Sequence, residues 1–225
     1  SLIHAGSKNK TKVNLHWIHS SKLEDENYSK LLKDINGVIV APGFGSRAIE
    51  GKIKAVEYAR LKQIPFLGIC LGMQCAVIEF ARNVLKMENA HSTEIDSQSE
   101  FPVISMMEEQ KQLEKMGGTM RLGSYQCDIE QHTLLHQIYS KKTIHERHRH
   151  RFEFNNQFID DFESNGMIFS GKNIKNNLME TIEIPTHPWF IGVQFHPEYK
   201  STVENPHPIF LSLIKAGLEH ASSVK

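Results

Sequence analysis

The stretch that decides the fold reads Pro65-Phe66-Leu67-Gly68-Ile69-Cys70-Leu71-Gly72-Met73-Gln74. A short apolar run ends on Cys70, with one glycine two positions before it and another two positions after it. This is the strand–turn–helix pattern of a nucleophile elbow, with cysteine where many hydrolases carry serine. The turn is sharp, so side chains at positions 68 and 72 would clash with neighbouring backbone. The pattern predicts a buried strand, Cys70 at the turn and a helix over 71–84.

The elbow also predicts a reactive sulfur. A helix that begins directly after Cys70 points its first amides and the positive end of its dipole at the thiol, which favours the thiolate. A cysteine in an apolar run is equally consistent with an inert core residue. The spacing around Cys70 alone does not separate the two interpretations.

A second apolar strand, far downstream, ends on a histidine in Phe190-Ile191-Gly192-Val193-Gln194-Phe195-His196-Pro197-Glu198. Pro197 prevents regular continuation of the strand. A thiol nucleophile needs a base for its proton, and the base needs an acceptor that orients its other ring nitrogen. His196 and Glu198 supply both from one strand end. Together the two motifs predict a Cys-His-Glu catalytic site.

Strands and helices alternate along the first half of the chain. We expect strands at 13–17, 37–41 and 66–69, helices at 21–35, 49–62 and 71–84, and a loop at 42–45. This alternation predicts an α/β fold of three layers, with a mostly parallel central sheet between helices and the chemistry at the carboxyl ends of the strands. The polar, methionine-rich stretch 91–123 predicts loops and a mobile lid. Further strands are expected at 125–129, 143–154, 167–170, 179–184 and 189–195, and a closing helix at 208–220.

Composition narrows the class of protein. The 225 residues suffice for one sizeable core, and Lys plus Arg equals Asp plus Glu at 26 each, which gives no electrostatic reason to expect nucleic acid or an acidic membrane surface as partner. No apolar run approaches the roughly 18 residues of a membrane span. Three cysteines are too few for a disulfide scaffold, which favours a reducing cytoplasm. Cys75 and Cys127 are expected to be packing residues.

The assembled motifs resemble the class I glutamine amidotransferases, and among them the glutaminase domains of the CTP synthases. Two motifs carry the class: Gly68-Ile69-Cys70-Leu71-Gly72-Met73-Gln74 and Phe195-His196-Pro197-Glu198. Three others narrow it: Met87-Glu88-Asn89-Ala90-His91-Ser92-Thr93-Glu94, Gly117-Gly118-Thr119-Met120-Arg121-Leu122-Gly123 and Glu146-Arg147-His148-Arg149-His150-Arg151-Phe152-Glu153. The family usually has Pro-Gly-Gly-Phe-Gly where this chain reads Ala41-Pro42-Gly43-Phe44-Gly45.

The resemblance implies one glutamine amidotransferase domain over 1–225. Ser1 to Gly6 is typical of the end of a helix, so we expect that the first strand of this domain and an N-terminal amidoligase domain precede it in the natural protein. No phosphate-binding P-loop motif is present, which assigns the nucleotide chemistry to the missing part.

The resemblance also implies roles for individual residues. Cys70 attacks the side-chain amide of L-glutamine, His196 moves the protons and Glu198 orients His196. The oxyanion is held by the amides of Gly43 and Leu71, and the substrate contacts are Gly43, Leu71, Gly72, Met73, Gln74, Glu94 and Arg151. Glu94 takes the substrate ammonium, Arg151 its carboxylate and Gln74 a hydrogen bond.

From the residues alone, two of these roles have rivals. Taken alone, Glu94 is more typical of a solvated surface acid than of a ligand-binding residue. The run 145–151 is compatible with a phosphate-binding patch, because alternate arginines share one face of a strand. The same run carries histidines, but arginines beside His148 and His150 repel a cation, which argues against a metal site.

No cofactor and no metal are expected in this domain. In the whole enzyme the resemblance implies ATP with Mg²⁺, GTP as activator, a covalently linked amidoligase domain that turns UTP into CTP, and a homotetramer. Two alternatives are a stand-alone gamma-glutamyl hydrolase or peptidase of the same fold and a non-catalytic regulatory module. The intact Cys70, His196 and Glu198 argue against the second alternative.

Overall fold

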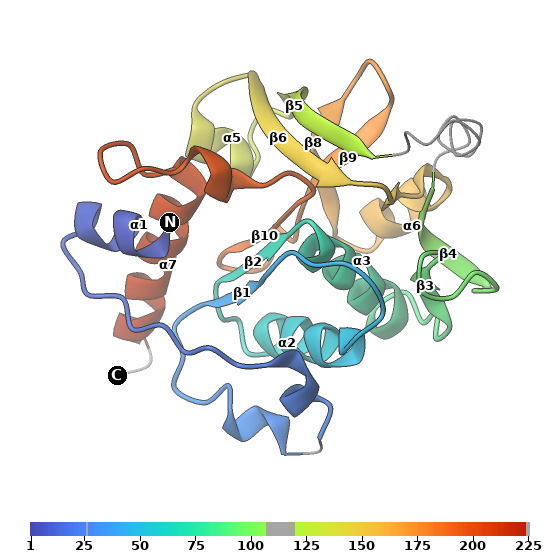
Figure 1. Cartoon of the computed structure of the whole chain (residues 1–225), viewed down its shortest axis with the longest axis horizontal. Helices are drawn as coiled ribbons and strands as arrows, with labels where there is room; N and C mark the ends of the chain where they lie inside the picture. Colours follow the sequence, from blue (N-terminus) through green and yellow to red (C-terminus); the bar gives the residue numbers. More distant parts are fainter. Residues whose placement is uncertain (26, 107–119, 224–225) are drawn as a thin grey trace.

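The computed structural model describes residues 1–25, 27–106 and 120–223. Its centre is a seven-stranded sheet in the order β1-β2-β10-β9-β8-β5-β6 (Figure 1). The strands in this order are Val38–Val40, Phe66–Ile69, Phe190–Val193, Leu178–Glu183, Ile168–Asn173, Arg121–Ile129 and Thr143–His150.

The α/β fold expected from the sequence is confirmed, with one correction to the sheet. The sheet is mixed, not mostly parallel: β1, β2 and β10 run parallel, whereas β10, β9, β8, β5 and β6 pair antiparallel in succession. The alternation of strands and helices that predicted parallel pairing stops after the first half of the chain. Strands joined by short connections then pair as antiparallel neighbours.

Helices cover both faces of the sheet and so complete three layers (Figure 1). One core contains residues of α2 (Ile49–Leu61), α3 (Leu71–Asn83) and α6 (Ile159–Ser164), and the other contains residues of α1 (Leu2–Lys8), α5 (Leu134–Tyr139) and α7 (Pro208–Ser223). Successive side chains of a strand point to opposite faces, so Phe66 packs in the first core and Leu67 in the second. Both faces of β2 are therefore buried, as its unbroken apolar run predicts.

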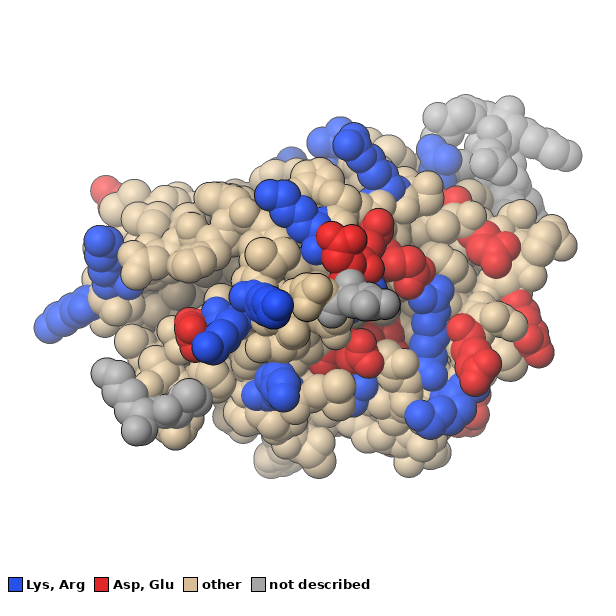
Figure 2. Space-filling view, turned by 90° about the horizontal axis from the view of Figure 1, so that it is seen from below, with Lys and Arg blue, Asp and Glu red and all other residues tan. Residues whose placement is uncertain are grey.

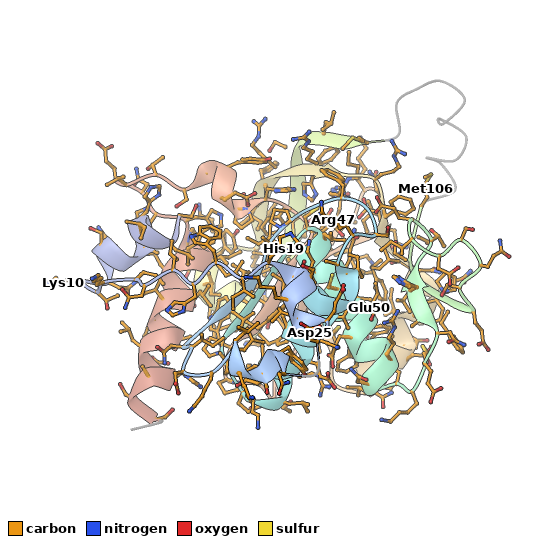
Figure 3. All side chains as sticks on the ribbon, turned by 60° about the horizontal axis from the view of Figure 1, so that its bottom comes forward. Lys10, His19, Asp25, Arg47, Glu50 and Met106 are labelled. Atoms are coloured by element: carbon orange, nitrogen blue, oxygen red, sulfur yellow. The ribbon has the colours of Figure 1, made fainter. Side chains whose placement is uncertain are left out.

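A second, three-stranded sheet lies beside the first, in the order β3-β4-β7, with bounds Ala90–Ser92, Phe101–Ser105 and Glu153–Phe154. It corrects the expectation that 91–123 is loop: residues 90–105 contribute two strands, and β5 begins at Arg121. The described chain stops after Met106, labelled in Figure 3, and resumes at residue 120. The proposed lid lies largely in 107–119, outside the described residues.

Two further expectations for the N-terminal part are wrong. Residues 11–19, all of them described, form neither strand nor helix, and Leu15 and Trp17 are 39% and 88% exposed. The stretch 21–35 forms two short 3-10 turns, η1 (Ser20–Leu23) and η2 (Tyr28–Lys30), instead of one helix. Asp34 adopts a left-handed conformation with φ of 61°, and polar turn-forming residues such as Asp25 and Asn27 favour such turns over a helix.

An ion pair at the surface links α2 and α3. Glu50, labelled in Figure 3 at the start of α2, accepts from Arg82 of α3 at 2.9 Å. On the face shown in Figure 2, Lys and Arg side chains are interspersed with Asp and Glu, in keeping with equal numbers of the two signs. Within the described part of the chain, no helix has the length and apolarity that a membrane crossing requires.

Candidate active site

The elbow at Cys70 has the predicted geometry. Cys70 lies between β2 and α3 with φ of 53° and ψ of −106°, a conformation that a side-chain-bearing residue rarely adopts. The turn is possible because both flanking positions lack a side chain. A Cβ at Gly68 would lie 2.6 Å from the Gly72 carbonyl oxygen, and one at Gly72 would lie 2.0 Å from the Val40 carbonyl oxygen. The two glycines are therefore required by close backbone contacts.

The surroundings of Cys70 favour the protonated thiol, whereas the helix start alone favours a thiolate. The Cys70 side chain is buried, and burial raises the pKa of the thiol to about 12. The Leu71 amide at the start of α3 donates to the sulfur and lowers this pKa, as the elbow predicts, but burial outweighs it and the carboxylates of Glu153, Glu198 and Glu94 raise it further. The nucleophile must therefore lose its proton during the reaction.

His196 and Glu198 form the expected pair at the end of β10. His196 Nδ1 lies 2.6 Å from Glu198 Oε1, which fixes Nδ1 as the protonated ring nitrogen and leaves Nε2 as the acceptor. The His196 main-chain amide donates to the Arg147 carbonyl of β6 at 2.8 Å, and its ring stacks on Tyr199 with 5.1 Å between centroids. The Glu198 hydrogen bond and the stacked Tyr199 ring thus fix the orientation of the imidazole, and Nε2 is available as a base.

The strand register brings nucleophile and base to one edge of the sheet. β2 and β10 are parallel neighbours with Ile69 opposite Val193, so Cys70 and His196 follow adjacent strand ends. The Cys70 amide donates to the Val193 carbonyl at 2.7 Å, which ties the elbow to β10. His196 Nε2 is buried and has no hydrogen-bond partner among the described residues. Among the described residues the sulfur does not form a hydrogen bond with the imidazole, and it donates instead to the Arg149 carbonyl at 4.0 Å.

A small pocket opens onto Cys70. Its lining brings together five of the seven substrate-contact residues expected from the sequence: Gly43, Leu71, Gln74, Glu94 and Arg151. The cavity measures about 20 Å³, little more than the room for one water molecule. A ligand of amino-acid size exceeds this volume, and two of the lining side chains, those of Phe44 and Arg151, are exposed and can move aside.

The other two expected contact residues lie elsewhere. The Met73 side chain is fully buried in the core, and Gly72 faces the Val40 carbonyl, so neither lines the pocket. Both lie in the first turn of α3, on parts of it that face the core and β1. A main-chain role for them stays a prediction.

Gln74 is buried and its amide nitrogen is already engaged. Nε2 donates to the Phe152 carbonyl at 3.0 Å and to Gln194 Oε1 at 3.2 Å. Within the described chain this leaves the Gln74 side-chain oxygen as the group that can face a ligand.

Sequence reasoning missed three residues of the lining: Phe44, His150 and Phe152. On β6 the side chains alternate, with Arg147 and Arg149 exposed and His148 and His150 buried. The alternation of Arg and His was visible in the sequence, and it indicated which residues share a face. It did not indicate that the histidine face is the inner one, because two arginines and two histidines give no hydrophobic pattern.

A larger cavity, of about 300 Å³, lies at β5 and the β8–β9 turn, lined by Ser124, Tyr125, Gln126, Asp128, His145, Asn173, Ile174, Lys175 and Asn176. It contains no thiol and none of the expected catalytic groups. The chemistry is therefore assigned to the smaller pocket, where the nucleophile is.

Comparison with known proteins agrees with this geometry. The family model described as glutamine amidotransferase class-I matches residues 1–216. The chain is 52% identical over 225 residues to the CTP synthase of Christiangramia forsetii, covering all of this chain and 41% of that protein. It is 55% identical over 226 residues to the CTP synthase of Chlorobium luteolum, covering all of this chain and 38% of that protein. The chain thus spans about two fifths of the length of these curated relatives.

A solved structure, the glutaminase domain of Trypanosoma brucei CTPS with bound acivicin, superposes with a TM-score of 0.92. It is 34% identical, and the match covers 97% of this chain and 85% of that one. Sequence, fold and the Cys70 elbow lead to one conclusion: the chain belongs to the class-I glutamine amidotransferase family, in which it is a glutaminase domain of the CTP synthase type.

Proposed function

We propose that this chain hydrolyses the side-chain amide of L-glutamine at Cys70 and supplies the ammonia for the synthesis of CTP. One observation carries the proposal: the strained Cys70 elbow and the His196–Glu198 pair follow adjacent parallel strands, with Ile69 opposite Val193. The lining of the pocket at the thiol includes one negatively and one positively charged side chain, Glu94 and Arg151, which suit the two opposite charges of a free amino acid.

The first half of the reaction forms a thioester. His196 Nε2 takes the Cys70 proton as the sulfur attacks the amide carbon, because a buried thiol with a raised pKa does not ionise beforehand. The negative oxygen that results accepts hydrogen bonds from the Gly43 and Leu71 amides. The carbon–nitrogen bond then breaks, and His196 returns the proton to the leaving nitrogen, which departs as ammonia.

The second half regenerates the thiol. His196 takes a proton from water as the water oxygen adds to the thioester carbon. The carbon–sulfur bond then breaks, and His196 returns this proton to the sulfur. Glutamate leaves. Throughout, Glu198 holds the imidazole in the tautomer with a free Nε2 and stabilises the imidazolium that forms twice.

Recognition of free glutamine rests on charge. Arg151 and Glu94 are exposed side chains from two separate parts of the chain, and both line the pocket. Neither forms an ion pair with another described residue. Arg151 takes the α-carboxylate and Glu94 the α-ammonium. The chain differs from the usual family motif at Ala41-Pro42, and this difference leaves Gly43 in place. A Cβ at position 43 would lie 3.3 Å from Leu71 Cδ2. A side chain at position 43 would therefore crowd the Leu71 side chain, which glycine avoids.

In the whole protein, ammonia reaches a linked amidoligase domain that converts UTP to CTP with ATP and Mg²⁺. GTP activates the whole protein, and the whole protein assembles as a tetramer. The size of the curated relatives supports a further domain, since this chain accounts for about two fifths of them. The three cysteines are free, and a reducing cytoplasm keeps the nucleophile in the thiol form.

The test is the release of glutamate and ammonia from L-glutamine by this chain and by its Cys70→Ala variant. We expect slow but Cys70-dependent release by the chain, and faster release when a full-length protein is given ATP, UTP and GTP. A gamma-glutamyl dipeptide serves as the second substrate. Preferential cleavage of the dipeptide would favour a stand-alone hydrolase, and release unaffected by Cys70→Ala would refute the proposal.

A further inference from the structure

Beneath the glutamine pocket lies a buried polar cluster that the proposed mechanism does not use. It consists of Arg121 on β5, His148 and His150 on β6, Glu153 on β7 and Glu180 on β9, each of them at most 6% exposed. Arg121 donates to Glu153 at 3.0 Å and to Glu180 at 2.8 Å. Burial of this many polar groups is costly unless they are satisfied, so their presence calls for a role.

The cluster lies directly behind a wall of the pocket. β6 ends at His150 and β7 begins at Glu153, so Arg151 and Phe152 are the two residues that cross from the large sheet to the small one. No strand pairing fixes this crossover. His150, Arg151 and Phe152 all line the pocket. The shape of the pocket must therefore depend on side chains that hydrogen-bond to the main chain of the crossover.

Two side chains converge on the Phe152 carbonyl. Gln74 Nε2 donates to it at 3.0 Å, and His150 Nδ1 lies 3.2 Å from it. A carbonyl only accepts, so His150 carries its proton on Nδ1. Burial lowers the pKa of His150 to about 3, so the ring is neutral at physiological pH and its Nε2 is an acceptor.

His148 completes the arrangement. Its Nδ1 lies 2.9 Å from His150 Nε2 and must be the donor, because that nitrogen has no proton. Burial also lowers the pKa of His148, to about 2, and the positive charge of Arg121 adds to the effect. The two neutral rings therefore form a directed chain of hydrogen bonds, from His148 to His150 to the Phe152 carbonyl.

We propose, on the basis of the proposed function, that His150 and His148 behind it are positioning residues for the substrate. By fixing the Phe152 carbonyl they hold the crossover in the shape that presents Arg151 to the α-carboxylate of glutamine. Neither imidazole contacts the reacting atoms. They set affinity for glutamine and leave the intrinsic reactivity of the Cys70 thiol unchanged.

The test compares two buried histidines that each hold a main-chain carbonyl at 3.2 Å. His150 holds Phe152, whereas His187 holds Ala59 on α2, away from the pocket. Each is changed to leucine in the 225-residue chain. Two rates are measured by mass spectrometry: labelling of Cys70 by a glutamine analogue with a diazo-ketone, and alkylation by iodoacetamide, which has no amino-acid end.

We expect His150→Leu to lower the labelling efficiency of the glutamine analogue by about 10-fold, the effect of one lost hydrogen bond, with iodoacetamide alkylation within about twofold. His187→Leu should leave the ratio of the two rates unchanged. His150→Asn keeps an N–H near the position of Nδ1 and should retain labelling within about threefold of the parent. This variant decides the matter if His150→Leu does not fold at the assay temperature.

The proposal is overturned if His150→Leu slows both reagents equally, if His187→Leu changes the ratio as much, or if His150→Asn loses labelling by 10-fold or more. A parent chain that reacts with iodoacetamide but not with the glutamine analogue would instead refute the proposed function. The two failures are thus distinguishable.

Discussion

The two halves of the large sheet contribute different things to the site. The parallel half, β1, β2 and β10, has short strands buried on both faces, and it carries Cys70 and His196 at strand ends. The antiparallel half, β9, β8, β5 and β6, has buried charges and alternating exposure, and it delivers Arg151 through the crossover that follows β6. The first half places reacting atoms through backbone geometry, and the second places a recognition group through side-chain hydrogen bonds.

This difference predicts different kinetic signatures. Changes at the ends of the parallel strands should lower kcat, because they affect groups that act in the transition state. Changes around the crossover should raise KM for glutamine and leave kcat nearly unchanged.

The largest effect is expected for Cys70→Ala. Removal of the nucleophile should lower glutamine hydrolysis by at least about 10⁴-fold. Cys75→Ala is the matched control, since Cys75 is a fully buried packing residue one helical turn further along α3. It should keep activity within about threefold. A comparable loss in both variants would mean that the thiols act through packing alone.

Glu198→Gln should come next, with kcat reduced by about 10²-fold or more. The amide can no longer stabilise the imidazolium across the 2.6 Å contact to His196 Nδ1. Glu204→Gln, at an exposed position in the loop that follows, is the control and should be neutral. If Glu198→Gln changed KM and spared kcat, the assignment of this pair to the chemical half would be wrong.

Arg151→Met tests the recognition half. Loss of a charge-assisted hydrogen bond to the substrate carboxylate should raise KM for glutamine by about 10- to 100-fold, with a much smaller change in kcat. Arg147→Met is the matched control, because Arg147 lies on the same exposed face of β6 and does not line the pocket. An equal rise in KM for both would point to a general effect of positive charge.

The smallest effect concerns stability and pH. Burial raises the pKa of Glu153 from 4.5 to about 8, so between these values the unfolded chain loses this proton while the folded chain keeps it. The contribution of Glu153 to stability therefore falls as pH rises through this window, by no more than a few kcal/mol. The lowered pKa values of His148 and His150 act in the opposite direction below the ordinary histidine pKa of about 6.5. Glu180, whose pKa burial also raises, acts in the same direction as Glu153.

Glu153→Gln removes this titration and should make the slope of the urea-unfolding free energy against pH more positive than that of the parent between pH 5 and 8. Glu183→Gln is the control, because Glu183 is buried and accepts from the Leu134 and Leu135 amides at the start of α5. It should lower stability and keep the parent's slope. An unchanged slope in Glu153→Gln would show that this carboxyl is ionised throughout the window.

The same division explains what the sequence could predict. The elbow at Cys70 and the pair His196–Glu198 depend on local signals: glycines that avoid backbone contacts, and a proline that ends a strand. Local signals also gave α2 and α3 to within a residue of their observed ends. Phe44, His150 and Phe152 reach the pocket because distant strands pair, and no local pattern reports such pairing.

The errors have the same origin. The mixed sheet follows from how β8, β9 and β10 pair, which depends on contacts far apart in the chain. The raised pKa of the Cys70 thiol follows from burial by many segments, whereas the helix start that favours a thiolate is visible in the sequence. The sequence around Cys70 thus predicted that the helix start lowers the pKa of the thiol, and the packed structure shows that burial raises it by more.

Selective labelling of Cys70 shows directly whether a glutamine pocket surrounds this thiol. The chain is treated with a diazo-ketone analogue of glutamine, with and without excess L-glutamine or L-glutamate, and the adduct is located by mass spectrometry of peptides. We predict an adduct on Cys70 alone, with Cys75 and Cys127 unmodified and with protection by glutamine that exceeds protection by glutamate. An adduct on either of the other cysteines, or labelling of Cys70 that glutamine does not slow, would contradict a glutamine pocket built around this thiol.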